Sequence, residues 1–425
     1  MDKFFKLSEH GTTVRTEILA GLTTFLTMAY IIFVNPLILK DAGMDQGAVF
    51  VATCLAAAIG TLAMGLYANY PIALAPGMGL NAYFTYAVVL GMGYTWQVAL
   101  GAVFLSGCIF LVISVLPIRE WIVNSIPRSL KMAISAGIGF FLGIIALAES
   151  GIVVDHPATL VTLGDVTSAP VLLAIGGFVV ILALKVTGAV IIGILLTTLV
   201  GILLGISQFN GVFDTPPDPS PVFLQLDIAG ALDAGLIAII FVFFMVDLFD
   251  NTGTLIGVLH RAGMLTPEGK LPRIGKALVV DSTAAMAGAA LGTSTTTSYI
   301  ESAAGIKAGG RTGPPAATVR VAVLLALFIA PLATSVPAYA TAPALLYVAC
   351  LMARGLVEMD WEDVTEYAPG VVMAFTMPLT YSIATGIGIG FIVYALGKLL
   401  SGKFSQLHPV VLLIAALFVV KFAFV

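Results

Sequence analysis

The chain has few charged residues, few cysteines and few histidines. Charged side chains make up 10% of its 425 residues, against about 25% in a soluble domain, which excludes a water-soluble globular protein. The three cysteines, Cys54, Cys108 and Cys350, fall in apolar stretches, so a disulfide framework is not expected. The sequence contains no zinc-ligand spacing and no phosphate-binding loop. We therefore expect no metal, no cofactor and no nucleic-acid partner.

Apolar residues dominate the composition. They make up 59% of the chain, and the mean hydropathy is +1.07. Successive apolar blocks approach 20 residues, which is long enough to cross about 30 Å of hydrocarbon. The 44 glycines and 21 prolines indicate close helix packing, kinks and broken helices. The composition predicts a protein that crosses the lipid bilayer many times.

Lysine and arginine are spread unevenly and predict the orientation of the chain. Arg15 and two lysines precede the first apolar block, whereas the loops 149–167 and 207–229 contain neither residue type. Positive charge collects on the cytoplasmic side of membrane proteins. Counting the blocks from a cytoplasmic N-terminus places nearly every basic cluster on that side, including Lys398 and Lys403. We expect a multi-pass protein of the cytoplasmic membrane with its N-terminus in the cytoplasm.

Two stretches cannot be continuous transmembrane helices. They are 68–84, which prolines and glycines interrupt, and 289–306, where a Thr/Ser run favours extended backbone. A polar, proline-rich linker at 207–227 separates the halves that contain them. Extended backbone at membrane depth must be buried in protein or line a cavity. Seven spans in each half is an odd number, so the second half would cross the membrane in the inverted orientation. Interruptions at matching places in two inverted halves indicate a transport site between the halves.

Two aspartates lie inside an apolar stretch of the second half. Asp247 and Asp250 belong to AGLIAIIFVFFMVDLFDNTGTLIGV. A carboxylate at the bilayer centre costs about 2.5–3.5 kcal/mol on insertion scales, so a buried polar site is the default hypothesis. Three residues apart, the two share a helix face, which suits a proton carrier. The alternative is that one of them caps a helix that starts in DNTGT.

Glu301 and Asn81 are the candidate ligand-binding residues of the two interrupted stretches. Glu301 follows the extended TTTSY run near the predicted start of a short helix. Its carboxylate could accept two N–H donors from a planar solute, or it could simply stabilise the helix start. Asn81 lies at the corresponding level of the first half. Its amide could bind a solute or satisfy the broken backbone.

Further polar residues have weaker claims to the site. Asp281, in VVDSTAAMAG, could tie helices together or assist coupling. Thr27, Tyr30 and Asn35 form a polar stripe on the first span. Serine and threonine in membranes bond to neighbouring helices more often than to ligands.

Four long motifs resemble the AzgA-like purine permeases. They are TEILAGLTTFLTMAYIIFVNP, ANYPIALAPGMGLNAYF, FVFFMVDLFDNTGTL and GTSTTTSYIESAAGIKAGGRTG. This family belongs to the nucleobase–cation symporters, also called the nucleobase–ascorbate transporter superfamily, and is related to the uracil permease UraA. The resemblance covers essentially the whole chain.

The resemblance implies an all-α membrane protein with fourteen segments as two inverted sets of seven. Short strands would lie in segments three and ten. A core domain would comprise 1–117 and 230–336, and a gate domain would comprise 118–229 and 337–425. A homodimer would form through the gate domain.

The resemblance also implies proton-coupled import of a purine base, such as adenine, guanine or hypoxanthine. Asp247, Glu301 and Asn81 would bind the base, and Asp250 and Asp281 would support binding or proton coupling. The co-transported proton would be the only other species required.

Three other classes compete with this interpretation. A SulP-like anion transporter shares the expected fold, but three acids at the site would need a basic partner. A channel suits two broken helices around protonatable groups less well than alternating access does. An intramembrane aspartyl enzyme would normally carry its two acids on different helices. We therefore expect a transporter and not an enzyme.

Overall fold

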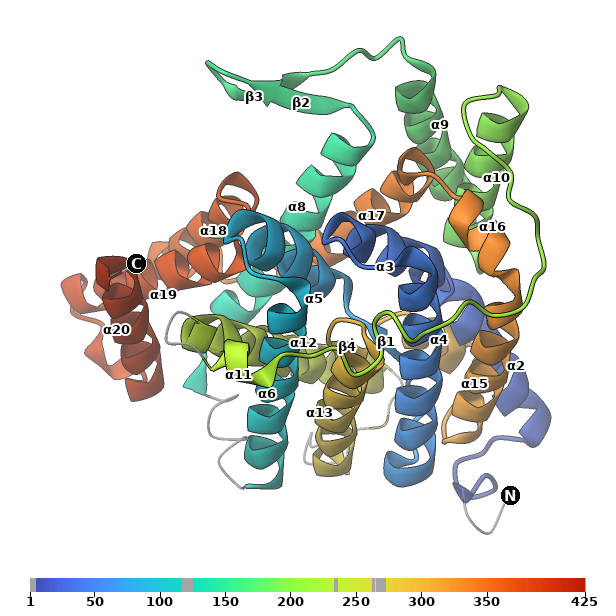
Figure 1. Cartoon of the computed structure of the whole chain (residues 1–425). Helices are drawn as coiled ribbons and strands as arrows, with labels where there is room; N and C mark the ends of the chain where they lie inside the picture. Colours follow the sequence, from blue (N-terminus) through green and yellow to red (C-terminus); the bar gives the residue numbers. More distant parts are fainter. Residues whose placement is uncertain (1–4, 117–124, 233–235, 262–263, 265–272, 425) are drawn as a thin grey trace. The chain divides into compact units, whose positions relative to one another are not determined.

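The structure is a computed structural model that describes residues 5–116, 125–232, 236–261, 264 and 273–424. The chain is mostly helical (Figure 1). Within those ranges, eight helices are long and apolar enough to cross a membrane, and three shorter helices are also apolar. The prediction of a multi-pass membrane protein is confirmed.

The chain folds into two compact units. Unit 1 comprises Met1–Val115 and Asp165–Ala344, and unit 2 comprises Leu116–Gly164 and Leu345–Val425. In unit 1 the elements are α2 (Val14–Met28), α3 (Ile31–Asp41), α4 (Gln46–Ala63), the π-helix η1 (Met64–Ala68), β1 (Leu74–Pro76), α5 (Met78–Ala82), the π-helix η2 (Tyr83–Gly91), α6 (Trp96–Val115), α9 (Ala169–Ala183), α10 (Ala189–Leu203), α11 (Ile228–Ala231), α12 (Ile237–Arg261), α13 (Ile274–Leu291), β4 (Thr296–Ser298), α14 (Ser302–Lys307), α15 (Pro314–Ala326), the 3-10 turn η4 (Leu327–Ile329) and α16 (Ala330–Ser335).

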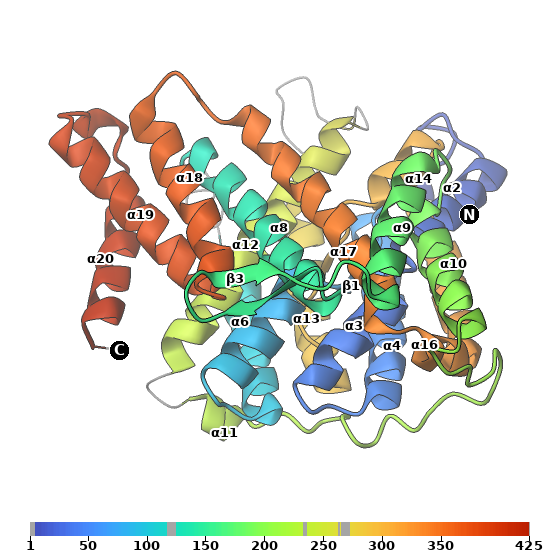
Figure 2. The same cartoon turned by 90° about the horizontal axis from the view of Figure 1, so that it is seen from above.

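The helix α17 (Ala338–Ala353) runs across the boundary between the units. In unit 2 the elements are α8 (Arg128–Glu149), β2 (Val153–His156), β3 (Leu160–Leu163), the 3-10 turn η5 (Arg354–Glu358), α18 (Val364–Leu379), α19 (Ile383–Leu400), the 3-10 turn η6 (Phe404–Gln406) and α20 (Pro409–Phe424). The helices α18 and α19 lie side by side and also pack on α8 (Figure 2).

The two interrupted stretches meet as a pair of antiparallel strands in unit 1. Leu74 of β1 lies opposite Ser298 of β4, and Pro76 lies opposite Thr296. Both strands are fully buried. Extended backbone in a buried place needs partners for its N–H and C=O groups. Each strand satisfies part of that need on the other, and side chains of neighbouring helices supply further bonds.

Helices of unit 1 enclose the strand pair. Helix α4 packs against β1, α13 against both strands, and α12 against β4 and α14. Gly288 lets α13 approach β4 closely, because a Cβ atom at this position would lie 2.4 Å from the Thr296 hydroxyl. A larger residue there would push the helix away from the strand.

A two-stranded hairpin corrects the prediction of an all-α protein outside segments three and ten. Strands β2 and β3 pair within the loop 149–167, with Val153 opposite Leu163 and His156 opposite Leu160. The hairpin is largely exposed. Its strands contain the β-branched residues that favour extended backbone. The sequence alone predicts only a loop without basic residues here.

The compact units differ from the predicted core and gate domains at 116–117, 165–229 and 337–344. Helices α9 and α10 lie side by side in both views (Figures 1 and 2). Helix α10 also packs against α2 within unit 1. The predicted division describes which parts move together, and it stays a prediction.

Candidate functional site

The strand pair is surrounded by buried polar side chains from distant parts of the sequence. Asp247, Asp281 and Asn81 have no solvent-exposed surface. They come from α12, α13 and α5, three elements that pack near β1 and β4. The side chain of Asp250 is only partly buried. Helix α12 runs without a break from Ile237 to Arg261, so the helix-capping alternative for its aspartates is wrong.

Amides line the first-half side of the site. The Nδ2 group of Asn81 donates a hydrogen bond to the Oδ1 atom of Asn35 over 2.8 Å. Asn35 in turn donates to the hydroxyls of Thr53 and Thr293. The Oδ1 atom of Asn81 accepts no hydrogen bond from the described residues. Asn81 therefore has its donor side held in place and one acceptor to spare.

A carboxylate and an amide on α12 connect this helix to β4. The Nδ2 group of Asn251 donates to the Oδ1 atom of Asp247 over 2.8 Å. The Oδ1 atom of Asn251 accepts from the Thr297 hydroxyl and from the backbone N–H of Ser298. The other oxygen of Asp247, Oδ2, accepts no bond from the described residues.

Asp281 approaches the same strand from α13. The Ser298 hydroxyl donates to the Oδ1 atom of Asp281 over 2.7 Å. Its Oδ2 atom, like that of Asp247, has no partner among the described residues. Ser298 thus bonds to Asn251 through its backbone and to Asp281 through its side chain.

Glu301 is held from the first span. The Tyr30 hydroxyl donates to the Oε1 atom of Glu301 over 2.6 Å, and the Thr27 hydroxyl donates to the Glu301 carbonyl. Glu301 stands at the start of α14, but its side chain makes no capping bond. Tyr30 and Thr27 therefore attach Glu301 to the first span. Asp250 lies on α12, three residues after Asp247.

Two aromatic residues that are close in sequence to Asp247 and Asn81 pack against each other. Phe243 is one helical turn before Asp247, and Tyr83 is two residues after Asn81. Their ring centroids are 5.0 Å apart in an edge-on arrangement, and both side chains are fully buried. The Tyr83 hydroxyl has no partner among the described residues. The site therefore combines apolar ring surface with spare polar atoms, as small-molecule sites commonly do.

Among the residues that the structure describes, the acids of the site have no basic partner. Within the part of the chain that the structure describes, no ion pair includes Asp247, Asp250, Asp281 or Glu301. The described part of the chain also contains no group of three or more acids, histidines and cysteines that could hold a metal ion. Unpaired buried carboxylates with free oxygens can accept N–H donors or protons.

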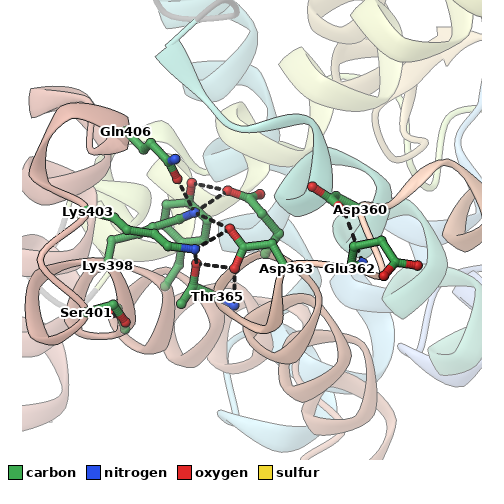
Figure 3. Close-up of polar contacts among 11 residues, drawn as sticks. Asp360, Glu362, Asp363, Thr365, Lys398, Ser401, Lys403 and Gln406 are labelled. Carbon is green, nitrogen blue, oxygen red and sulfur yellow. Dashed lines mark hydrogen bonds and ion pairs between the residues drawn. The ribbon is translucent and has the colours of Figure 1, made fainter.

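Unit 2 contains a second buried polar cluster of a different kind (Figure 3). The fully buried Nζ atom of Lys398 lies 2.6 Å from Glu366 and 3.4 Å from Asp363. It also donates to Gln406, while Lys403 donates to Asp363 over 2.6 Å. Opposite charges are paired here, so this cluster joins the start of α18 to the end of α19.

The sequence pattern indicates the acids and, in the polar stripe of Thr27, Tyr30 and Asn35, some of the residues that bond to the site, but not Asn251 or Ser298. The structure brings Asp247, Asp281, Asn81 and Glu301 to the strand pair. Asn251 was read only as part of a possible helix start. Its position, four residues after Asp247 in a helical pattern, was the available signal. The roles of the predicted site residues in substrate binding and proton coupling stay predictions.

Comparison with known proteins gives a consistent family assignment. A sequence profile of the Permease family, Xan_ur_permease, matches residues 15–389. Adenine permease AdeP of Escherichia coli (strain K12) is 47% identical over all of this chain and 96% of its own length. Guanine/hypoxanthine permease PbuG of Bacillus subtilis (strain 168) is 45% identical over the full length of both chains.

A solved structure shares the fold. The transmembrane domain of the cyanobacterium bicarbonate transporter BicA aligns with a TM-score of 0.66 at 15% sequence identity, over 87% of this chain and 96% of that chain. At this identity the likeness concerns the fold alone. The sequence matches identify a transporter and not an enzyme. The chain belongs to the Permease family, and within it to the AzgA-like permeases that its motifs resemble.

Proposed function

We propose that this protein imports a purine base across the cytoplasmic membrane together with a proton, by alternating access. The observation that carries the proposal is the set of spare, buried acceptor atoms beside the strand pair, Asp247 Oδ2 and Asn81 Oδ1. They lie in a chain that is 40% to 47% identical to proteins named as adenine or guanine/hypoxanthine permeases.

The chemistry of a purine matches this set of groups. A purine is flat and apolar on its faces, and its edge carries N–H donors and ring-nitrogen acceptors. Tyr83 and Phe243 offer aromatic surface for the faces. Asp247 and Glu301 offer oxygens for the N–H donors, and Asn81 offers an amide. The roles of these three side chains in binding the base are part of the proposal.

A proton would supply the driving force. Protonation makes the carboxylate of the empty site neutral. A neutral site moves through the membrane at a lower free-energy cost than a charged site does. One proton moving down 100 mV supplies about 2.3 kcal/mol, enough for roughly fifty-fold accumulation. Asp250 and Asp281 are the groups we assign to coupling, since both are acids of the site without a basic partner in the described ion pairs.

The proposal includes the architecture that alternating access needs. Fourteen segments in two inverted sets of seven would form a moving core and a fixed gate, with the N-terminus in the cytoplasm. The pairing of β1 with β4, one strand from each half, supports a site at the interface of two repeats. A dimer would form through the gate domain.

Uptake into proteoliposomes tests the proposal. The probes are radiolabelled adenine, guanine, hypoxanthine, uracil, sulfate and bicarbonate, with an inward proton gradient imposed or collapsed by uncoupler. We expect gradient-dependent uptake of at least one purine by the wild type and none by Glu301→Gln. Uptake of sulfate or bicarbonate alone would favour the anion-transporter alternative, and purine uptake indifferent to the gradient would reject proton coupling.

A further inference from the structure

Asn251 forms a fully buried bridge between α12 and β4. Its amide donates to the Asp247 carboxylate over 2.8 Å. Its oxygen accepts from the Thr297 hydroxyl over 2.6 Å and from the Ser298 backbone N–H over 2.9 Å. Together the three bonds connect Asp247 to β4 through the side chain of Asn251.

The backbone fixes which way the amide of Asn251 points. A backbone N–H can only donate, so the atom that faces Ser298 must be the side-chain oxygen of Asn251. The NH₂ group must then face Asp247, which has to accept with Oδ1. The orientation of this amide therefore follows from the strand and is not a free choice between oxygen and nitrogen.

The orientation of Asn251 in turn determines which oxygen of Asp247 remains available. Oδ1 is occupied by Asn251, whereas Oδ2 has no partner among the described residues. Ser298 also donates its hydroxyl to Asp281 on α13. The position of the Asp247 carboxylate is thus tied through Asn251 to β4 and, through Ser298, to a second helix.

We infer that Asn251 is a positioning residue for transport, which holds Asp247 so that its Oδ2 atom is the one left for the N–H of the substrate. The inference rests on the proposed function and goes beyond it, because it assigns a role to a residue that does not itself need to contact the base. It predicts an effect on apparent affinity that a loss of stability alone would not produce.

Asn251→Asp is the most selective variant. It keeps the size of the side chain and an oxygen for Thr297 and Ser298, but it replaces the donor to Asp247 with a second oxygen. Losing a hydrogen bond to a charged group should raise KM for the transported purine by roughly ten- to hundredfold. The bonds to β4 remain, but a second carboxylate then faces Asp247 in a buried place, so we expect a lower unfolding temperature as well; Thr61→Val controls for that loss of stability.

Thr61→Val provides a matched control on the other strand. The Thr61 hydroxyl is fully buried and bonds to the backbone N–H and C=O of Leu74 in β1. Its two bonds are to backbone and not to an acid. Valine has nearly the same shape, so the variant removes a side-chain tie to a strand without altering a carboxylate. We expect a lower unfolding temperature and an unchanged KM.

The test measures KM and Vmax for radiolabelled adenine, guanine and hypoxanthine in proteoliposomes with an inward proton gradient. A raised KM in Asn251→Asp with wild-type KM in Thr61→Val supports the inference. Wild-type KM in Asn251→Asp overturns it, even if Vmax falls. If that variant does not fold, Asn251→Ser replaces it, since serine is too short to reach both Asp247 and β4. Failure of the wild type to take up any purine would overturn the proposed function itself.

Discussion

The acids beside the strand pair of unit 1 and the acids of the lysine cluster in unit 2 have opposite surroundings. In unit 1, Asp247 and Asp281 each use one oxygen for a neutral hydrogen-bond donor and leave the other without a described partner. In unit 2, Asp363 faces the ammonium groups of Lys398 and Lys403 (Figure 3). Glu366 also pairs with Lys398. A carboxylate that is paired with a cation helps to specify how the helices pack, whereas an unpaired carboxylate can accept a proton or an N–H group of a substrate.

This contrast predicts that acids of the two units respond differently to neutralisation. Neutralising an acid beside the strand pair of unit 1 should abolish transport without unfolding the protein. Removing charge in unit 2 should weaken folding and leave the apparent affinity for substrate intact. Each of the following variants can contradict that division.

Asp247→Asn should have the largest effect on transport. Asparagine keeps an oxygen for Asn251 but cannot carry the charge or the proton that the site requires. We expect Vmax/KM for the purine to fall by about a hundredfold or more. The unfolding temperature should be unchanged or higher, because a buried charge without a cation partner is removed. Normal transport by this variant, or a clear loss of stability, would show that Asp247 is not an acid that serves transport alone.

Lys398→Met should have the largest effect on stability. Lys398 is fully buried, and its loss leaves Glu366 and Asp363 without their inner cation. Breaking a buried pair costs about 3–5 kcal/mol, and we expect the lower end because both acids are partly exposed. Denaturant unfolding in detergent measures the loss, with KM in the surviving protein as the second readout.

Lys403→Met is the matched control for Lys398→Met. Lys403 faces the same Asp363 carboxylate, but its side chain is 35% exposed, so water can replace the lysine. Exposed pairs contribute at most about 1 kcal/mol. Equal losses in the two lysine variants would show that burial of Lys398 does not determine its contribution.

The two clusters also differ in how far the sequence predicts them. The acids Asp247 and Glu301 stand out because carboxylates are costly in an apolar stretch. The interrupted stretches stand out because proline and threonine runs oppose helix. The paired strands β1 and β4 occur inside those stretches.

The partners of these acids depend on geometry that the sequence does not contain. Asn251 and Ser298 are 47 residues apart, and their bond requires the register of β4 against α12. Lys398 and Lys403 read as ordinary cytoplasmic charges, since only the packing of α18 on α19 brings them to Asp363 and Glu366. Local sequence patterns identify the charged residues whose burial costs free energy. Tertiary packing decides which of these residues have partners that offset that cost.

Glu17 represents a third kind of buried acid and gives a smaller predicted effect. Its carboxylate is fully buried and accepts the backbone N–H groups of Arg311 and Thr312. Glu17→Gln keeps one oxygen and replaces the other with a donor that faces an N–H group. We expect a loss of about 1–3 kcal/mol in unfolding free energy. An increase in KM with no loss of stability would instead place Glu17 with the acids of the site.

Acid should weaken the unit 2 cluster by a small amount and in a definite direction. The hydrogen bond from Lys403 to Asp363, followed by bonds from Thr365, holds the pKa of this carboxyl below its usual range. A depressed pKa stabilises the folded state above the ordinary value, about 3.9, and that contribution is lost as the pH falls below it. The unfolding temperature of the wild type should therefore decline more steeply than that of Asp363→Asn once the pH falls below about 4. Parallel curves for the two proteins would mean that Asp363 gains nothing from its lysines, and the paired acids of unit 2 would then lose the property that separates them from the unpaired acids of unit 1.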